Sequence, residues 1–539
     1  MRELQGPAGA LVSMGVCRRF RAKEWVARTR TSFAAARPRG FGGGSLFLLA
    51  WLLAHVPVPP PASPAGSVGI PAAAAQRDQR QGRQAQRDQR QGRQAQRNQR
   101  QGRQAQNGQT EVFRTEVPER PYDIVLGNPS ATSVTASIFS TSALTGYFEY
   151  GDRPGNYQWR SDPVQLAPGM PTEVILAGLS PNSQYFYRWR ITTGSPESVD
   201  ASEEFTFRTG RSHGESFVFT VQADSHLDVR TEPRLYEASL RNAKAANPDF
   251  HVDLGDTFMT DKRRVDHREA LPQYLAQRYY FGLIGTSAPV FLVSGNHDGE
   301  GIRRGAMGKW AREQRETYFA TPSDGARDRG NYYSWEWGDA LFVALDPYWA
   351  TSRARGGDNY WARTLGEDQF RWLATTLRSS RARFKFVFIH HLVGGADQAA
   401  RGGVAAAGLF EWGGRGLDGT YEFDDRRPGW GQPIHRLLVD TGVTVVFHGH
   451  DHVFAREELD GIAYLLVPQP GLDRYGAPRD ISESYPGPDV IGGPGHVRVT
   501  VSTGAAVVEL VQTRLAGTDG NGRVAHSFRL DPNCTSDCQ

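Results

Sequence analysis

Cysteine is scarce in this chain: 539 residues include only three, Cys17, Cys534 and Cys538. All three lie outside the central region that carries the chemical motifs, and the G-x-S-x-G match at Gly210–Gly214 leads into an apolar strand-like run and not into a helix, as a nucleophile elbow would. The sequence therefore gives no support to nucleophilic catalysis by Cys or Ser. Cys534 and Cys538 belong to a C-terminal tail, residues 531–539, where they either close a small disulfide or remain thiols.

The N-terminal apolar stretch, SLFLLAWLLAHVPV, is too short for a typical membrane span, which needs about 20 residues. It follows residues 1–44, which contain nine Lys or Arg and two Glu. We interpret residues 1–75 as a signal peptide region with a small-residue cleavage site at Ala72–Ala75. We therefore expect an exported protein, periplasmic, cell-surface or secreted, and an uncleaved membrane anchor is the alternative.

The part of the chain that we expect to fold has no excess of positive charge, although the whole chain carries a net charge of +4. Residues 1–75 contribute +7, and three Arg/Gln-rich decapeptides over residues 76–105 contribute another +7, which leaves −10 for residues 106–539. This balance disfavours a specific nucleic-acid partner. We predict that residues 76–117 form a disordered linker, and contact of residues 76–105 with an anionic surface remains an alternative.

Five apolar runs in the middle of the chain each end in polar residues. In chain order they are FVFTVQADSH, DFHVDLGD, PVFLVSGNHD, FKFVFIHH and VTVVFHGHDH. The runs read as buried strands, and ligands bind at the carboxyl ends of strands in open α/β sheets. Carboxylates and neutral imidazoles together suit Zn, Fe or Mn, and in a two-metal site one carboxylate bridges ions about 3.5–4 Å apart. Asp256 is the candidate bridge.

The order D-x-H, G-D, G-N-H-[DE], H, G-H-x-H resembles the calcineurin-like metallophosphoesterase superfamily over roughly residues 214–512. The resemblance implies an α/β fold, a four-layer α/β/β/α sandwich, which we place at residues 214–530. Helical patterns before several of the strands agree with it. It also implies two divalent or mixed-valence metal ions as cofactors, and hydrolysis by a metal-activated hydroxide.

Carried over by motif, the resemblance assigns Asp224, His226, Asp256 and His452 to one ion, and Asp256, Asn296, His390 and His450 to the other. His390 is preferred to His391 because the strand FKFVFIH ends there. His297 is left to bind a phosphoryl oxygen or protonate the leaving group, with Asp298 as the carboxylate that orients it, and Asp228 lies outside the motifs. Each residue alone also has a structural explanation, such as a turn at Gly255-Asp256.

Ahead of the motifs, residues 118–209 contain short alternating runs separated by Gly, Pro, Asn and Ser, which indicates an antiparallel β-sandwich. Leu179, Pro181 and Tyr185 resemble the L-x-P-x-x-x-Y corner of fibronectin type III domains. Such a domain before the motifs is similar to the arrangement in plant-type purple acid phosphatases. Two positions depart from that family: His226 replaces its glycine, and Met259 replaces its iron-binding tyrosine.

We therefore expect an exported phosphoesterase that acts on small-molecule or lipid phosphate esters, either mono- or diesters. The alternative is a non-catalytic surface binding protein in which the β-sandwich binds the partner and the metal-binding fold is a degenerate scaffold. The complete set of ligand residues favours the enzyme.

Overall fold

The computed structural model describes residues 112–532, except 193–198, 264–265, 300–304, 323–330, 352–359, 395–402, 479–480, 482–483 and 486–489. The predicted signal region, nearly all of the linker, and both cysteines of the tail lie outside these residues. Within the described residues, no helix has the length and apolar content that crossing a bilayer would require.

An all-β region comes first, as predicted. One of its sheets has the order β1-β2-β6, formed by Asp123–Gly127, Ser133–Phe139 and Thr172–Ala177. The other contains β3 (Leu144–Gly151), β4 (Trp159–Arg160), β5 (Val164–Leu166), β7 (Gln184–Thr192), β8 (Val199–Ala201) and β9 (Phe205–Arg208). Side chains of both sheets share one core, which includes Ile138, Leu176 and Trp189. The hydroxyl of Tyr185 accepts a hydrogen bond from the Ser180 N–H at 2.8 Å, as in a tyrosine corner.

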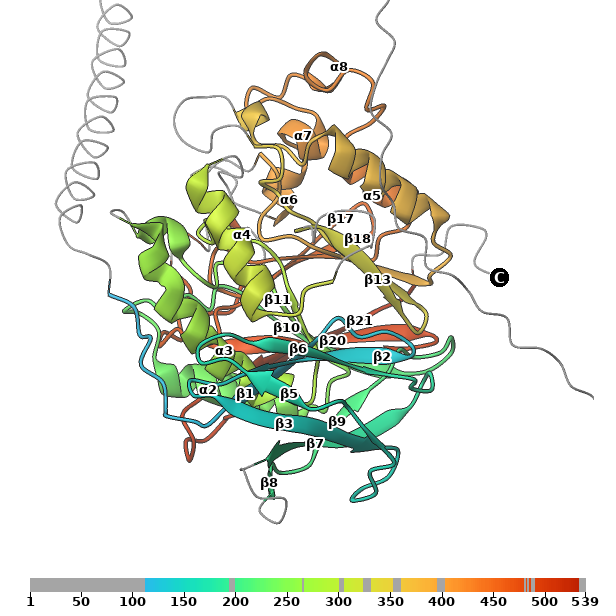
Figure 1. Cartoon of the computed structure of the whole chain (residues 1–539). Helices are drawn as coiled ribbons and strands as arrows, with labels where there is room; N and C mark the ends of the chain where they lie inside the picture. Colours follow the sequence, from blue (N-terminus) through green and yellow to red (C-terminus); the bar gives the residue numbers. More distant parts are fainter. Residues whose placement is uncertain are drawn as a thin grey trace, which may run out of the picture. The chain divides into compact units, whose positions relative to one another are not determined.

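Two six-stranded sheets follow (Figure 1). The first has the order β12-β11-β10-β19-β20-β21: Val290–Leu292, Phe250–Asp253, Phe217–Gln222, Gly495–Ser502, Ala505–Gln512 and Val524–Leu530. The second has the order β13-β14-β15-β16-β18-β17: Tyr333–Trp337, Ala340–Ala344, Phe384–Phe388, Val445–His448, Ile462–Leu466 and Ala455–Leu459. In the first sheet β10 pairs with β19, so strands far apart in the sequence are neighbours.

The two sheets pack through phenylalanine. Phe219 stacks on Phe250 with ring centroids 5.3 Å apart, and it meets Phe342 and Phe386 of the second sheet edge to face. Alternation along β15 explains the layering, because Phe384, Phe386 and Phe388 enter this core while Val387 enters the core under the helices.

Helices cover the outer faces of both sheets, which confirms the four-layer prediction. α2 (Pro233–Ala245) and α3 (Leu271–Gly285) lie on the first sheet. α5 (Glu367–Ser379) and α9 (Ile434–Asp440) lie on the second. The described helices also include α4 (Ala306–Tyr318), α6 (Gly403–Ala407), α7 (Phe410–Gly413) and α8 (Phe423–Arg426). The sequence has helical patterns at residues 232–247, 268–284, 366–380 and 433–442, which correspond to α2, α3, α5 and α9. It gave no prediction for α4 or for the edge strands β17 and β21.

A buried arginine joins the β-sandwich to the four-layer region that follows it, residues 214–530, which is called the catalytic region below because of the phosphoesterase resemblance of its motifs. Arg278 of α3 is fully buried; its Nε lies 2.7 Å from Asp123 Oδ1, and its Nη2 donates to the Ser137 carbonyl at 2.9 Å. Its Nη1 donates to the carbonyl of Tyr318, at the end of α4. One side chain therefore ties two strands of the sandwich to two helices of the catalytic region.

We expect Arg278→Met to lower the free energy of unfolding by about 3 kcal/mol, because it leaves a buried carboxylate without this partner. The loss falls at the low end of the range for buried pairs because Arg120 also contacts Asp123, at 2.7 Å. Arg188→Met, which breaks a partly exposed pair with Glu149 inside the sandwich, is the matched control and should cost about 1 kcal/mol or less. Equal midpoints in urea unfolding of the two variants would contradict this role for Arg278.

Candidate metal centre

The five motifs meet at the carboxyl ends of strands from both sheets. β10, β11 and β12 of the first sheet lead into the loops of Asp224, Asp256 and Asn296, and β15 and β16 of the second lead into those of His390 and His450. Parallel pairing of β10 with β11 and of β11 with β12 puts the loops of the first sheet on one edge of that sheet. Parallel pairing of β15 with β16 does the same for the loops of the second sheet. Alternating strand and helix in the sequence thus brings the motifs together.

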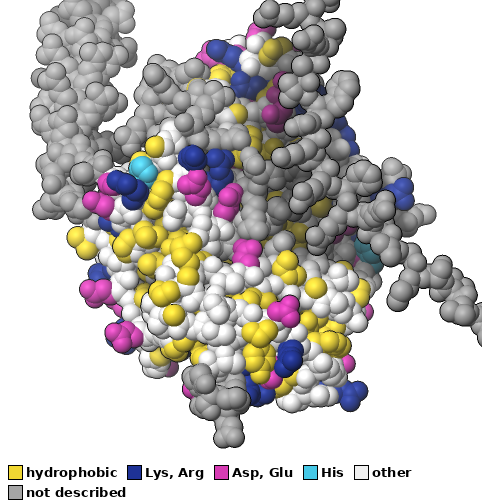
Figure 2. Space-filling model, in the orientation of Figure 1, with side chains coloured by type: hydrophobic (Ala, Val, Ile, Leu, Met, Phe, Trp, Pro, Cys, Tyr) yellow, Lys and Arg dark blue, Asp and Glu magenta, His cyan; other side chains and the backbone are white. Residues whose placement is uncertain are grey.

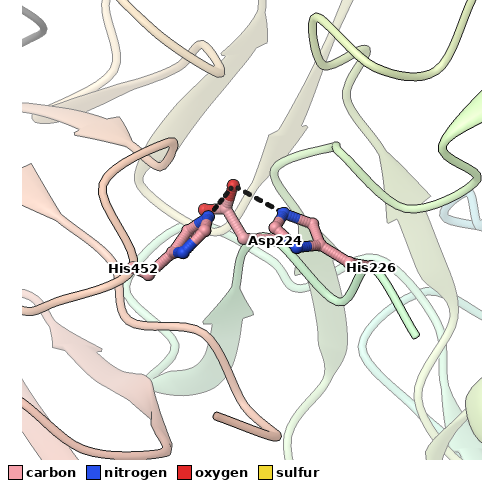
Figure 3. A group of neighbouring side chains, drawn as sticks. All are labelled: Asp224, His226 and His452. Atoms are coloured by element: carbon pink, nitrogen blue, oxygen red, sulfur yellow. Dashed lines mark ion pairs between the residues drawn. The ribbon is translucent and has the colours of Figure 1, made fainter. Parts of the chain in front are cut away.

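The first cluster of ligand atoms consists of Asp224, His226 and His452. The Nε2 atoms of both histidines lie 3.5 Å from Asp224 Oδ1, and both rings are directed at this carboxylate (Figure 3). One ligand atom of each residue lies within 4.8 Å of the others. Asp224 precedes β11 in the chain and His452 follows β16, so the cluster joins the first and last motifs.

The second cluster consists of Asp256, His390 and His450, which also fall within 4.8 Å of one another. His390 Nε2 lies 3.3 Å from Asp256 Oδ2, 3.3 Å from His450 Nδ1 and 3.1 Å from Asn296 Oδ1. The amide oxygen of Asn296 therefore lies close to the ligand atoms of Asp256, His390 and His450. His390 Nε2 also lies 3.9 Å from Asp224 Oδ1, so the two clusters adjoin.

His391 is not a member of either cluster. Its Nε2 is paired with the hydroxyl of Tyr348, and its Nδ1 lies 2.9 Å from the carbonyl of Leu392. The geometry agrees with the choice of His390, because residues that follow one another beyond a strand end point in different directions.

The first cluster has the properties of a cation site. Asp224 Oδ1 and both ring nitrogens of His226 are buried without a hydrogen-bond partner, which is costly unless another group binds them. Burial would lower the pKa of His226, but Asp224 and Asp228 raise it to about 9. Burial likewise opposes ionisation of Asp224, yet His452 and His226 hold the pKa of its carboxyl well below its usual range. These residues therefore fit a positively charged ion with nitrogen and oxygen ligands.

Asp256 acts electrostatically on both clusters. It raises the pKa of His390, against the effect of burial, to about 10, and it contributes to the raised pKa of His226. The pKa of its own carboxyl is lowered by His390 and His297 despite full burial. Asp256 therefore acts on side chains of both clusters, and its role as the bridging carboxylate stays a prediction.

The ligands occupy strained backbone conformations. Asp224, Asp256, His450 and His452 all have positive φ, between 56° and 81°. Such conformations are rare for residues with side chains and persist at functional sites where the surroundings enforce them. The adjacent glycines permit this arrangement: a Cβ on Gly295 would lie 2.1 Å from the Asp256 nitrogen.

Asp298 holds the second and third motif loops together. Its carboxylate accepts hydrogen bonds from the backbone N–H groups of Asp256, Thr257, Phe258 and Gly295, at 2.8–3.0 Å. We expected Asp298 to orient the ring of His297, but the structure corrects this expectation, because the carboxylate beside that ring belongs to Asp261.

His297 lies at the accessible side of the clusters. Its Nδ1 is 3.0 Å from Asp261 Oδ1, and its Nε2 is 4.0 Å from Asp256 Oδ2. Its side chain is 24% exposed, in contrast to the fully buried His390. The ring thus faces the ligands without joining either cluster. The sequence signal for Asp261 was weak: it is a lone carboxylate after the G-D motif, with no fixed spacing to His297.

Two further residues lie near the site, and one of them, Asp228, was not expected there. Asp228, which the sequence placed outside the motifs, lies with its Oδ2 3.5 Å from His226 Nδ1 and pairs with Arg230 at 2.7 Å. Asp228 therefore contacts the ring nitrogen of His226 that faces away from Asp224. Met259 is buried at the position where purple acid phosphatases carry tyrosine, and it has a φ of 49°.

Comparisons with known proteins agree with this geometry. Residues 217–454 match the family model described as calcineurin-like phosphoesterase. The structure of PhoD superposes with a TM-score of 0.55 and 15% sequence identity, over 76% of this chain and 90% of that one. The purple acid phosphatase PPD1 from yellow lupin (Lupinus luteus) gives 0.53 and 16%, over 76% and 74%. At such identities the two structures support the fold. No curated protein sequence matches the chain.

We expect Asp256→Asn to lose one or both bound ions, because the change removes the negative charge that acts on both clusters while it preserves shape. Asp249→Asn is the matched control: Asp249 is equally buried, sits just before the same strand, and pairs with Arg211 at 2.5 Å. The control should be less stable but keep its metals in elemental analysis. Asp256→Asn with two bound ions and full turnover would exclude the bridge.

Proposed function

We propose that this chain, whose residues 217–454 form a calcineurin-like phosphoesterase domain, uses two metal ions to hydrolyse phosphate mono- or diesters. The observation that carries the proposal is the pair of adjoining clusters, Asp224/His226/His452 and Asp256/His390/His450, with Asn296 beside the second. Zn, Fe and Mn are the candidate ions, because the ligand atoms are carboxylate, amide and imidazole.

Two bound ions would supply Lewis acidity, which activates a water molecule for attack and offsets negative charge on the phosphoryl oxygens. The remaining tasks fall to the chain. Asp261 accepts a hydrogen bond from Nδ1 of His297, which orients the ring and directs Nε2 toward the clusters. When both ring nitrogens carry a proton, His297 donates its Nε2–H to a phosphoryl oxygen or gives that proton to the departing alkoxide.

The charge distribution supports a small-molecule or lipid substrate. On the face shown in Figure 2, Lys and Arg side chains are intermixed with Asp and Glu, and the described residues of that face form no broad basic patch. Attraction for a phosphate ester therefore depends on the metal centre itself. We also propose export, based on the apolar segment within residues 1–75, and treat anionic-surface contact by residues 76–105 as a secondary proposal.

Removal of metal should abolish hydrolysis. Every proposed ligand must hold an ion before water is activated, so a chelator is expected to stop turnover of nitrophenyl mono- or diesters, and Zn, Mn, Fe or Co is expected to restore it. Full activity in protein shown to be metal-free would exclude the proposal. No hydrolysis by the fully loaded protein would favour the binding-protein alternative.

A spectroscopic prediction concerns Met259. With Met259 in place of tyrosine, the active protein should lack a strong visible tyrosinate-to-iron band.

Replacement of His297 should separate catalysis from metal binding. We expect His297→Ala to retain about two ions but to lose about 10²–10⁴-fold in rate, less for esters whose leaving group needs no proton. Asp261→Asn should lose about 10–100-fold, because the ring remains but its orientation is no longer fixed.

The matched control for these variants is His435→Ala, which removes a His–Asp pair of similar length, 3.0 Å to Asp460, outside both clusters. It should leave the rate within about twofold of the unchanged protein. If His297→Ala loses an ion, or if its rate on alkyl phosphates is unchanged, the acid role is wrong.

A further inference from the structure

Two glutamines of α3 contact the loops that carry the first and second motifs. Gln273 and Gln277 are one helical turn apart, so both side chains leave the same face of the helix, and both residues are fully buried. Neither belongs to a motif, and neither has a task in the chemistry described above.

Each amide group joins both loops. Gln277 Nε2 donates to the carbonyls of Ser225 and Thr257, at 3.1 Å each, and Gln273 Nε2 donates to the carbonyls of His226 and Thr257. Ser225 and His226 stand in the first motif loop, and Thr257 directly follows Asp256. The two side chains thus link the backbone beside ligands of the first cluster to the backbone beside the proposed bridge.

Glutamine suits this position for a chemical reason. An amide nitrogen carries two hydrogens and can therefore satisfy a carbonyl on each loop at once, whereas a carboxylate offers only acceptors. The orientation of Gln277 is also fixed, because its Oε1 accepts a hydrogen bond from the Tyr236 hydroxyl at 3.0 Å. Tyr236 in turn accepts from Gln222 at 3.1 Å, so the nitrogen of Gln277 is held toward the loops.

We propose that Gln273 and Gln277 are positioning residues, which set the spacing between the first and second motif loops and thereby the affinity of the first cluster for its ion. The inference rests on the proposed function, since it assumes that the clusters bind metal. It adds two residues of a helix that the motif pattern does not identify.

The experiment titrates the metal-depleted full chain with Zn²⁺ and measures both binding steps and the melting temperature. Gln277→Met and Gln273→Met are expected to weaken one of the two steps about 10–100-fold, the range seen when support of a metal ligand is removed. Gln277→Glu should weaken it more than Gln277→Met, because its oxygens face the carbonyls of Ser225 and Thr257.

Gln369→Met is the matched control for loss of a buried glutamine. Gln369 of α5 is fully buried, and its Nε2 donates to the carbonyls of Asp346 and Leu365. We expect Gln369→Met to lower the melting temperature as the α3 variants do. Its affinity for Zn²⁺ at both binding steps should equal that of the unchanged chain. If the α3 variants lose stability but bind both ions as the unchanged chain does, the inference is wrong. If the unchanged chain binds no Zn²⁺ or other candidate ion, the proposed function itself fails.

Discussion

The four hydrogen bonds accepted by Asp298 are the constraint on which the site depends. Backbone N–H groups on two different loops converge on one buried carboxylate, so the loops after β11 and β12 cannot move independently. The bonds are charge-assisted and lie in a low-dielectric environment, where such bonds are strong. Asp256 and Asn296 thereby keep a fixed relation although they come from separate strands.

A second constraint reaches the site from the β-sandwich. The sandwich contacts α3 through Arg278, and the Tyr187 hydroxyl donates to the carbonyl of Thr286, just after the helix, at 2.7 Å. The next turn of α3 toward its start carries the glutamines that contact the motif loops. The sandwich therefore supports the helix from one side while the helix supports the metal centre from the other.

Sequence patterns predicted the parts of this protein that are local. Apolar runs identified β10, β11, β12, β15 and β16, and the residues after each run proved to be the ones that approach one another. The four-layer fold was implied by the family resemblance of the motifs, and the alternation of strands and helices agreed with it. The domain boundaries, export, the fibronectin type III likeness and the roles of the site residues other than Asp298 stay predictions.

The sequence did not predict the carboxylates that contact the histidines of the site from outside the motifs. His297 pairs with Asp261 because a 3₁₀ turn, Thr260–Lys262, brings that carboxylate back toward the third motif loop. Asp228 reaches His226 through a turn in which Leu227 has a φ of 55°. Neither turn has a periodicity that could be read in advance, and a single unaligned sequence offers no other signal for such pairs.

The first cluster joins residues that lie far apart in the sequence, since Asp224 follows β10 and His452 follows β16. An ion bound there acts as a cross-link across most of the domain. Closing a loop of more than about 100 residues removes chain entropy worth on the order of 5 kcal/mol from the unfolded state. Under the proposed function, an ion bound there would contribute to the durability of the fold as well as to its chemistry, and scarcity of the ion would shorten the lifetime of the protein itself.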